Sequence, residues 1–400
     1  MALISIAKLL LFIVAVPSLL QSRQTGLSGA GTTNSLVPIW TLAALAVLAA
    51  SLFWTSSPMG EALNSLGKYG KLLVVVILML IIRTRKEAVC ALVSFLALQT
   101  FLVFGSWALF WGVKLPWATS NMALTQYSVF SSYLDQGIMS ATAAAVLWHV
   151  RSLLANKTAR IGITVIAAIA MVNVLFVLQG RSGHVVAVAL LSLAIMWELP
   201  KRFRALAVVL PFVLIGFLYL ASDRVSNRLN DVISEVQTFT PSDQADTSSG
   251  IRLTLWIRAS QMIAQQPLTG YGLGNWNTQY NTDQQLRNTK APLIKTNYNT
   301  HQEYLQWGVQ LGIPGLLLFL GWMACIFRDT LRMATPNSRA TLSVLTAFAV
   351  ACVFNSSLYD AYIGDFFCVA LGLLLALGLQ DKYSDEPVSL QNSQPHGAAA

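Results

Sequence analysis

The sequence predicts an all-α polytopic membrane protein with about 11–12 transmembrane helices and one large outer loop that contains amphipathic helices. Of its 400 residues, 55% are hydrophobic and 11% are charged, whereas about a quarter of a soluble domain is charged. Apolar runs near the roughly 20 residues that cross a bilayer recur along the chain, and positive charges gather in every second short connection. This composition excludes an ordinary soluble enzyme, a disordered chain, a coiled coil and a nucleic-acid-binding domain.

Eleven apolar runs are predicted to cross the membrane, at residues 2–20, 36–54, 70–82, 87–112, 133–150, 161–178, 184–199, 205–221, 302–327, 340–355 and 363–380. Connections 83–86, 151–160, 201–204 and 328–339 each hold three positive residues, which predicts a cytoplasmic location. Eleven spans leave the N-terminus outside, and a twelfth within residues 20–70 would put both termini inside. We expect an N-terminal transmembrane bundle (1–221), an outer loop subdomain (222–300), C-terminal transmembrane helices (301–380) and a disordered cytoplasmic tail (381–400).

The outer loop is predicted to contain two amphipathic helices that lie against the membrane face. Apolar residues recur at helical spacing in two stretches: Val225, Leu229, Val232, Ile233 and Val236, and then Leu255, Trp256, Ala259, Met262 and Ile263. The polar stretch 238–250 is a flexible link between them. Pro267 ends the second pattern, and the glycine run 270–275 predicts an irregular loop.

His301 is the candidate general base. Thr300 and Glu303 have the spacing of a capping box just before the ninth apolar run, which makes His301 the first helical residue, at the outer membrane surface. The positive end of the helix dipole disfavours an imidazolium, so we expect its pKa to lie below about 6.5. A neutral histidine there is suited to accept a proton. The alternative is a structural histidine; Glu303 is expected to be a cap rather than a catalyst.

Small residues follow His301 along the same predicted helix. Gly308, Gly312 and Gly315 would let another helix approach closely within a bilayer. Pro314 is predicted to bend the helix. These glycines are interpreted as packing devices that fix His301 in place.

Two arginines are candidate ligands for a phosphate group. Arg181 lies in the turn Gly180-Arg-Ser-Gly183 between two spans, on the side where the charge pattern disfavours arginine, so an anionic partner is expected. A guanidinium matches two phosphate oxygens at once, although a lipid headgroup would serve equally. Arg252 lies at the predicted start of the second outer helix, where a bound anion is favoured. Arg258, on another helical face, and Tyr304 complete the predicted substrate-binding set.

No metal or cofactor is predicted. The four histidines have no zinc spacing, and the sequence contains no Asp-x-Asp motif of the kind that binds a metal–diphosphate. His184 is interpreted as structural. One base and two arginines on the outer face suit transfer from a diphosphate, whose leaving-group charge is neutralised without a metal.

These motifs resemble those of the O-antigen ligase and polymerase superfamily of bacterial inner-membrane proteins. His301-Gln302, nine residues and Gly312-Ile-Pro-Gly315 resembles the ligase motif of His, Asn/Ser/Gln, nine residues and Gly-x-x-Gly. Gly180-Arg-Ser-Gly183 resembles the arginine turn of the family. Residues 250–256 with 267–275 are similar to its Gly-Arg-x-x-x-Trp and Pro-Leu-x-Gly-x-Gly-x-Gly-Asn stretch. The resemblance covers residues 160–380.

The resemblance implies an O-antigen ligase, in which the outer side is the periplasm and the large loop is periplasmic. Such an enzyme transfers O-antigen from undecaprenyl diphosphate to a sugar hydroxyl of lipid A–core. It implies that Arg181 and Arg252 hold the diphosphate while His301 activates the acceptor hydroxyl. The expected partners are donor, acceptor and membrane lipids, without a nucleic acid. We expect inversion at the anomeric carbon by a single in-line displacement.

Three alternatives stay open. An O-antigen polymerase uses the same donor and a second lipid-linked repeat as acceptor, and Leu316-Leu317 stand where ligases have two threonines. A protein O-oligosaccharyltransferase is a second alternative. A transporter of the same lipid is the third, although transporters favour ionisable groups near the midplane, whereas the candidate residues here lie at one face.

Overall fold

The computed structural model describes residues 13, 35–221, 223–237, 248–287 and 299–384. Within these ranges the chain forms helices joined by short connections, and no strand is present. The all-α fold class is therefore confirmed. The predicted span 2–20, apart from residue 13, lies outside the described residues, as do residues 385–400 of the predicted tail 381–400. Residues 381–384 continue α16.

The helices follow the predicted runs closely. The first half contains α2 (Val37–Ala50), α3 (Met59–Tyr69), α4 (Leu72–Ile81), α5 (Arg85–Phe110), α6 (Ala123–Gln126), α7 (Tyr133–Val150), α8 (Lys157–Val172) and α9 (Arg181–Glu198). The second half contains α10 (Leu210–Ala221), α11 (Asp223–Gln237), α12 (Ser248–Gln265), α13 (Asn275–Arg287), α14 (Glu303–Thr330), α15 (Thr335–Phe354) and α16 (Ala361–Ser384).

Seven segments among the described residues are long and apolar enough to cross a membrane: 59–81, 85–110, 157–177, 181–198, 303–330, 335–354 and 361–380. The predicted runs 36–54, 133–150 and 205–221 also form helices, but these are shorter or less apolar. Helix α7 shows the reason, because residues 136–147 are all buried against α8, α9 and α15. A helix surrounded by protein has no need of a lipid-facing apolar surface.

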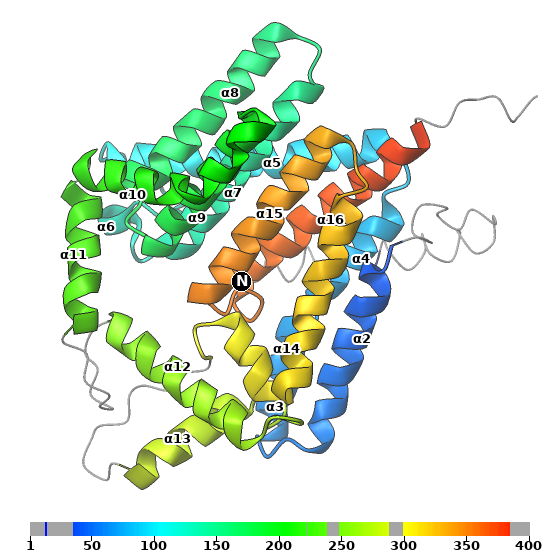
Figure 1. The fold of residues 1–400 in the computed structure, drawn as a ribbon, viewed down its shortest axis with the longest axis vertical. Helices are drawn as coiled ribbons and strands as arrows, with labels where there is room; N and C mark the ends of the chain where they lie inside the picture. Colours follow the sequence, from blue (N-terminus) through cyan, green and yellow to red (C-terminus); the bar gives the residue numbers. More distant parts are fainter. Residues whose placement is uncertain (1–12, 14–34, 222, 238–247, 288–298, 385–400) are drawn as a thin grey trace, which may run out of the picture.

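The bundle has two distinguishable ends. At the first, which we call the basic end, Arg339 pairs with Glu198 at 3.7 Å, and Arg151 interacts electrostatically with both. Ser35 donates to Asp329 near this end, so the chain from α2 through α4 makes two passes of the bundle. Residues 20–34, the first part of the range proposed for a twelfth span, lie outside the described residues. At the other end, the loop end, the glycine loop between α12 and α13 lies against α3, since a Cβ at Gly274 would lie 3.0 Å from the backbone of Ala62 (Figure 1).

The described residues between 223 and 301 form three helices, so the prediction of two was wrong. The third, α13, is polar, but Trp276 and Tyr280 are buried one turn apart and stack at 5.2 Å between ring centroids. They join a cluster with Leu255, Ala259, Met262 and Val309. Because Val309 belongs to α14, this segment packs directly on the bundle and is not a separate fold.

The glycine loop after α12 pairs with an interruption in α14. Gly312 adopts φ 70° and ψ −163°, which breaks the helix two residues before Pro314. Gly272 donates its backbone N–H to Gln310 O at 2.9 Å, and Ile313 donates to Pro267 O at 2.7 Å. The predicted bend is therefore a break at Gly312, whose freed backbone groups bind the loop. Earlier in α14, Gly308 leaves room for Ile263 of α12, as the packing prediction requires.

We predict that Gly312→Ala lowers the melting temperature of the detergent-solubilised protein by roughly 5 °C or more. The backbone conformation at Gly312 is essentially restricted to glycine and costs other residues about 1–3 kcal/mol. An added Cβ would also lie 2.5 Å from Pro267 O. Gly162→Ala is the control, because its Cβ in α8 would meet nothing within 4 Å. Equal melting temperatures for the two variants would show that the backbone conformation at Gly312 does not require glycine.

Candidate active site

Close packing of α7 and α9 positions Arg181. A Cβ at Gly180 would lie 3.2 Å from Tyr133 O, and one at Gly183 would lie 3.0 Å from the Cα of Gly137. These glycines bring the first turns of the two helices together. Arg181 is the first residue of α9, so the prediction that it lies in a turn between helices is corrected. It therefore lies at the loop end, beside Tyr133.

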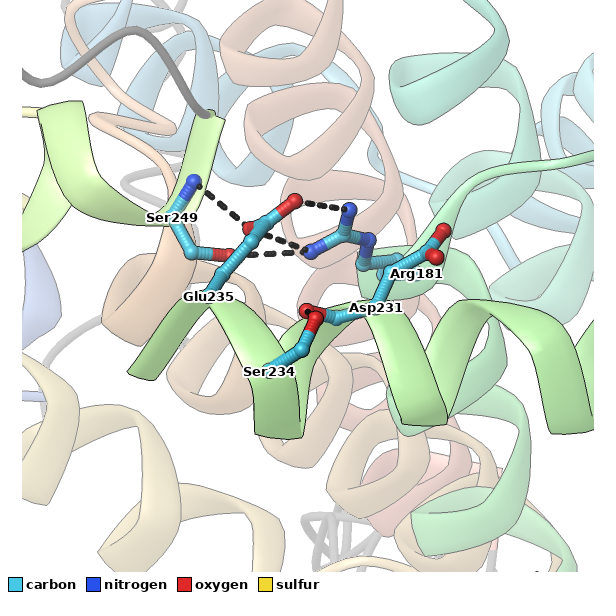
Figure 2. Close-up of polar contacts among 5 residues, drawn as sticks. All are labelled: Arg181, Asp231, Ser234, Glu235 and Ser249. Carbon is cyan, nitrogen blue, oxygen red and sulfur yellow. Dashed lines mark hydrogen bonds and ion pairs between the residues drawn. The ribbon is translucent and has the colours of Figure 1, made fainter. Parts of the chain in front are cut away.

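The anionic partner of Arg181 in this structure is a side chain, Glu235 of α11. The guanidinium of Arg181 lies 3.4 Å from each carboxylate oxygen of Glu235 and donates to Ser249 Oγ at 2.9 Å. Ser249 also donates its backbone N–H to Glu235, which closes the triangle drawn in Figure 2. Burial raises the pKa of Glu235, but the hydrogen bonds from Ser249 and Arg181 and the charge of Arg181 outweigh it, so the pKa lies below its usual value.

Arg252 lies next to this triangle. Helix α12 begins at Ser248, so Arg252 lies in its second turn and the prediction of a position at the helix start was wrong. Burial, followed by the positive charge of Arg181, lowers the pKa of Arg252, while Tyr133 and Glu235 oppose the shift. Among the described residues none donates to or accepts from its guanidinium. Arg252 thus adds a second positive charge near Arg181, whose ion-pair partner is Glu235.

His301 precedes helix α14 and does not belong to it. The helix begins at Glu303, and His301 has a left-handed backbone with φ 51°, a conformation that histidine tolerates better than most residues. Its backbone N–H donates to Asn299 Oδ1 at 2.9 Å. The predicted capping box is thus wrong, because Thr300 Oγ1 accepts from Gln302 N and donates to Gln302 O instead.

The imidazole of His301 is held neutral by its surroundings. Burial, followed by the charge of Arg252, lowers the pKa of His301 to about 4. A lowered pKa agrees with the sequence-based prediction, although that prediction attributed the shift to the helix dipole. Among the described residues none forms a hydrogen bond with the ring. A neutral, partly buried imidazole with an unshared nitrogen lone pair is able to accept a proton.

Glu303 has a different role from the predicted cap. Its fully buried carboxylate accepts backbone N–H groups from Leu358 at 2.9 Å and Tyr359 at 3.3 Å. It also accepts from Trp307 Nε1 at 3.0 Å. Glu303 therefore joins the start of α14 to the connection between α15 and α16.

The other predicted site residues make contacts of their own. Tyr304 donates its hydroxyl to Ala349 O of α15 at 2.9 Å. Arg258 donates to Gln261 Oε1 at 3.1 Å within α12. The ring nitrogens of His184 lie 2.8 Å from Gly180 O and 3.2 Å from Leu175 O, which agrees with its structural interpretation. None of these contacts involves Arg181, Arg252 or His301.

The structure brings the three principal candidates close enough for their charges to matter. The charge of Arg181 contributes to the lowered pKa of Arg252, and the charge of Arg252 contributes to the lowered pKa of His301. The sequence analysis missed Glu235 and Tyr133 as neighbours, because neither belongs to a recognisable motif. In the described residues, no three His, Cys, Asp or Glu side chains are grouped to hold a metal ion. Chemically, the group combines a neutral base with cationic charge for an anion.

We predict that Arg252→Met raises the pKa of His301 from about 4 toward the ordinary value. Removal of a nearby positive charge favours the imidazolium, while burial still holds the pKa below about 6.5. Nuclear magnetic resonance titration of histidine-labelled protein in detergent measures the shift. Arg258→Met is the matched control and should leave the titration of His301 unchanged. An equal shift in both variants would contradict the central place of Arg252.

Comparison with known proteins gives one family match. No curated protein matches the chain. Residues 166–320 match the model of a family described as O-antigen ligase. The matched range runs from α8 into α14 and includes Arg181, Arg252 and His301. With its apolar helices, the chain is a multi-pass membrane protein, and this match supports its assignment to the O-antigen ligase/polymerase superfamily.

Proposed function

We propose that the protein is an O-antigen ligase of the bacterial inner membrane. In this proposal it moves O-antigen polysaccharide from undecaprenyl diphosphate to a sugar hydroxyl of lipid A–core. The basic end faces the cytoplasm, in line with the distribution of positive loops, and the loop end faces the periplasm. The principal support is the neutral imidazole of His301 beside the positive charge of Arg252.

The reaction follows from the charges of these groups. His301 accepts the proton of the acceptor hydroxyl, whose oxygen attacks the anomeric carbon of the donor sugar. The bond from that carbon to the diphosphate oxygen breaks in line, and its electron pair leaves with the undecaprenyl diphosphate. Arg252 and Arg181 stabilise the charge that develops on the departing diphosphate. The configuration at the anomeric carbon is inverted, and no resident metal takes part.

Donor binding must compete with the ion pair of Arg181 and Glu235. Their contacts at 3.4 Å are longer than those of a tight charge-assisted hydrogen bond, about 2.7–2.9 Å. A diphosphate offers more negative charge and more acceptor oxygens than one carboxylate. We infer that it replaces Glu235 as the partner of Arg181, while Arg252 already faces the site without a hydrogen-bonded partner among the described residues.

His301→Gln and Arg252→Ala are expected to suppress transfer while the protein still inserts. Loss of a positioned base costs about 10²–10⁴-fold, and loss of one charge-stabilising donor costs about 10²–10³-fold. The measurement is the lipopolysaccharide ladder of a ligase-deficient cell that carries each variant, with the membrane-inserted amount determined in parallel. Arg332→Ala, an exposed change between α14 and α15, is the control.

A normal ladder with His301→Gln would overturn the role of His301. The cell without the protein distinguishes the two activities of the superfamily. Loss of a ligase leaves a lipid-linked polymer that never reaches the core, whereas loss of a polymerase leaves a single repeat on the core. The second outcome would replace ligase with polymerase in this proposal.

Glu235→Gln is expected to lower the KM for the lipid-linked donor several-fold. The amide keeps a hydrogen-bond acceptor for Arg181 but removes the charge that competes with the diphosphate. Steady-state transfer with purified donor and acceptor measures KM and kcat separately. Ser234→Ala on the same helix is the control, since its hydroxyl donates to Asp231 O within α11. A raised KM in Glu235→Gln would show that the carboxylate assists donor binding instead.

A further inference from the structure

The connection between α15 and α16 lies against the segment that carries His301. It begins with Asn355, Ser356 and Ser357, all buried, and ends with Asp360. None of these residues belongs to the motifs of the sequence analysis, and the connection lies beyond residue 320, where the family match ends. Its contacts with the His301 segment are therefore a feature that the sequence did not reveal.

Two carboxylates join the two segments in opposite directions. Glu303, from the His301 side, accepts the backbone N–H groups of Leu358 and Tyr359. Asp360, from the other side, accepts from Asn299 Nδ2 at 3.3 Å. Each segment thus supplies one carboxylate to the other, so the relative position of the two is fixed at two points.

Asp360 is itself anchored to a third element. Lys71, almost completely buried at the start of α4, donates to Asp360 O at 2.6 Å. Burial raises the pKa of Asp360 to about 6, against the opposing charges of Lys71 and Lys68. The two ammonium groups favour the ionised carboxylate, which accepts the hydrogen bond from Asn299.

Asn299 carries the connection from Asp360 to His301. Its amide nitrogen donates to Asp360, and its amide oxygen accepts the backbone N–H of His301 at 2.9 Å. His301 lies outside the helix and has a left-handed backbone, so the regular hydrogen bonds of α14 do not hold it. A residue in such a conformation persists only where its surroundings determine it.

We propose that Asn299 and Asp360 are positioning residues, which hold the backbone of His301 so that its imidazole stays beside Arg252. The inference rests on the proposed function, because it assigns the pair to the base of that reaction. Neither residue is required to touch a substrate. Their effect is on the placement of the imidazole, and a displacement of about 1 Å at a reacting group costs on the order of 10²-fold in rate.

The test compares Asn299→Ala, Asp360→Ala, the double variant and Asp360→Asn in a transfer assay with purified donor and acceptor. Each alanine variant is expected to lower kcat by about 10–100-fold, with the donor KM within about twofold of the wild type. The kcat of the double variant should fall no further than that of either single variant, because both changes break the same Asn299–Asp360 hydrogen bond. Asp360→Asn should keep most of its activity, since its amide oxygen still accepts from Asn299.

Asn64→Ala, an exposed change on α3, is the matched control. Three results would overturn the proposal. The first is a wild-type kcat in the alanine variants, and the second is a fold-loss of kcat in the double variant equal to the product of the two single losses. The third is a change in KM without a change in kcat. If the alanine variants fail to fold, Asp360→Asn decides alone, and its inactivity would overturn the proposal, because its amide oxygen still accepts from Asn299. Absence of transfer by the wild-type protein would instead contradict the proposed function.

Discussion

The break in α14 at Gly312 is the constraint on which the site depends. An uninterrupted helix would satisfy its own backbone groups and would offer none to the loop after α12. Because the helix is broken, Val309 and Gln310 accept hydrogen bonds from Tyr271 and Gly272. These bonds join α12, which carries Arg252, to the helix that follows His301. Two residues more than 45 positions apart in the sequence thereby reach one point.

The electrostatics of the site follow from that placement. Burial, followed by the charge of Arg252, lowers the pKa of His301, and burial, followed by the charge of Arg181, lowers the pKa of Arg252. A base with a pKa of about 4 is reliably neutral but weak. An anion bound at Arg252 would offset its charge and raise the pKa of His301. In the proposed reaction, donor binding therefore strengthens the base that attacks the donor.

The sequence was informative where a short pattern determines the local structure, and less so where tertiary contacts decide. Long apolar runs predicted the helices of the bundle, and the arginine and histidine motifs indicated residues that the fold brings together. The capping box at Thr300 failed because Glu303 is bound by the distant backbone of Leu358 and Tyr359. Helix α13 was missed because its buried side belongs to Trp276 and Tyr280 within a polar stretch.

The neighbours of the site were the hardest to predict, since each depends on a contact between distant segments. Glu235 and Arg181 are 54 positions apart, and Asn299 and Asp360 are 61 apart. Glu235 acts on Arg181, which the motifs indicated, and Asp360 acts on Asn299, which they did not. Glu235 satisfies Arg181 with a contact that a diphosphate can replace, whereas Asp360 is anchored by Lys71 and joined to Asn299. The site thus has one carboxylate that a diphosphate can replace, Glu235, and one that is held in place behind His301, Asp360. This difference would allow donor binding to move α11 while His301 keeps its position.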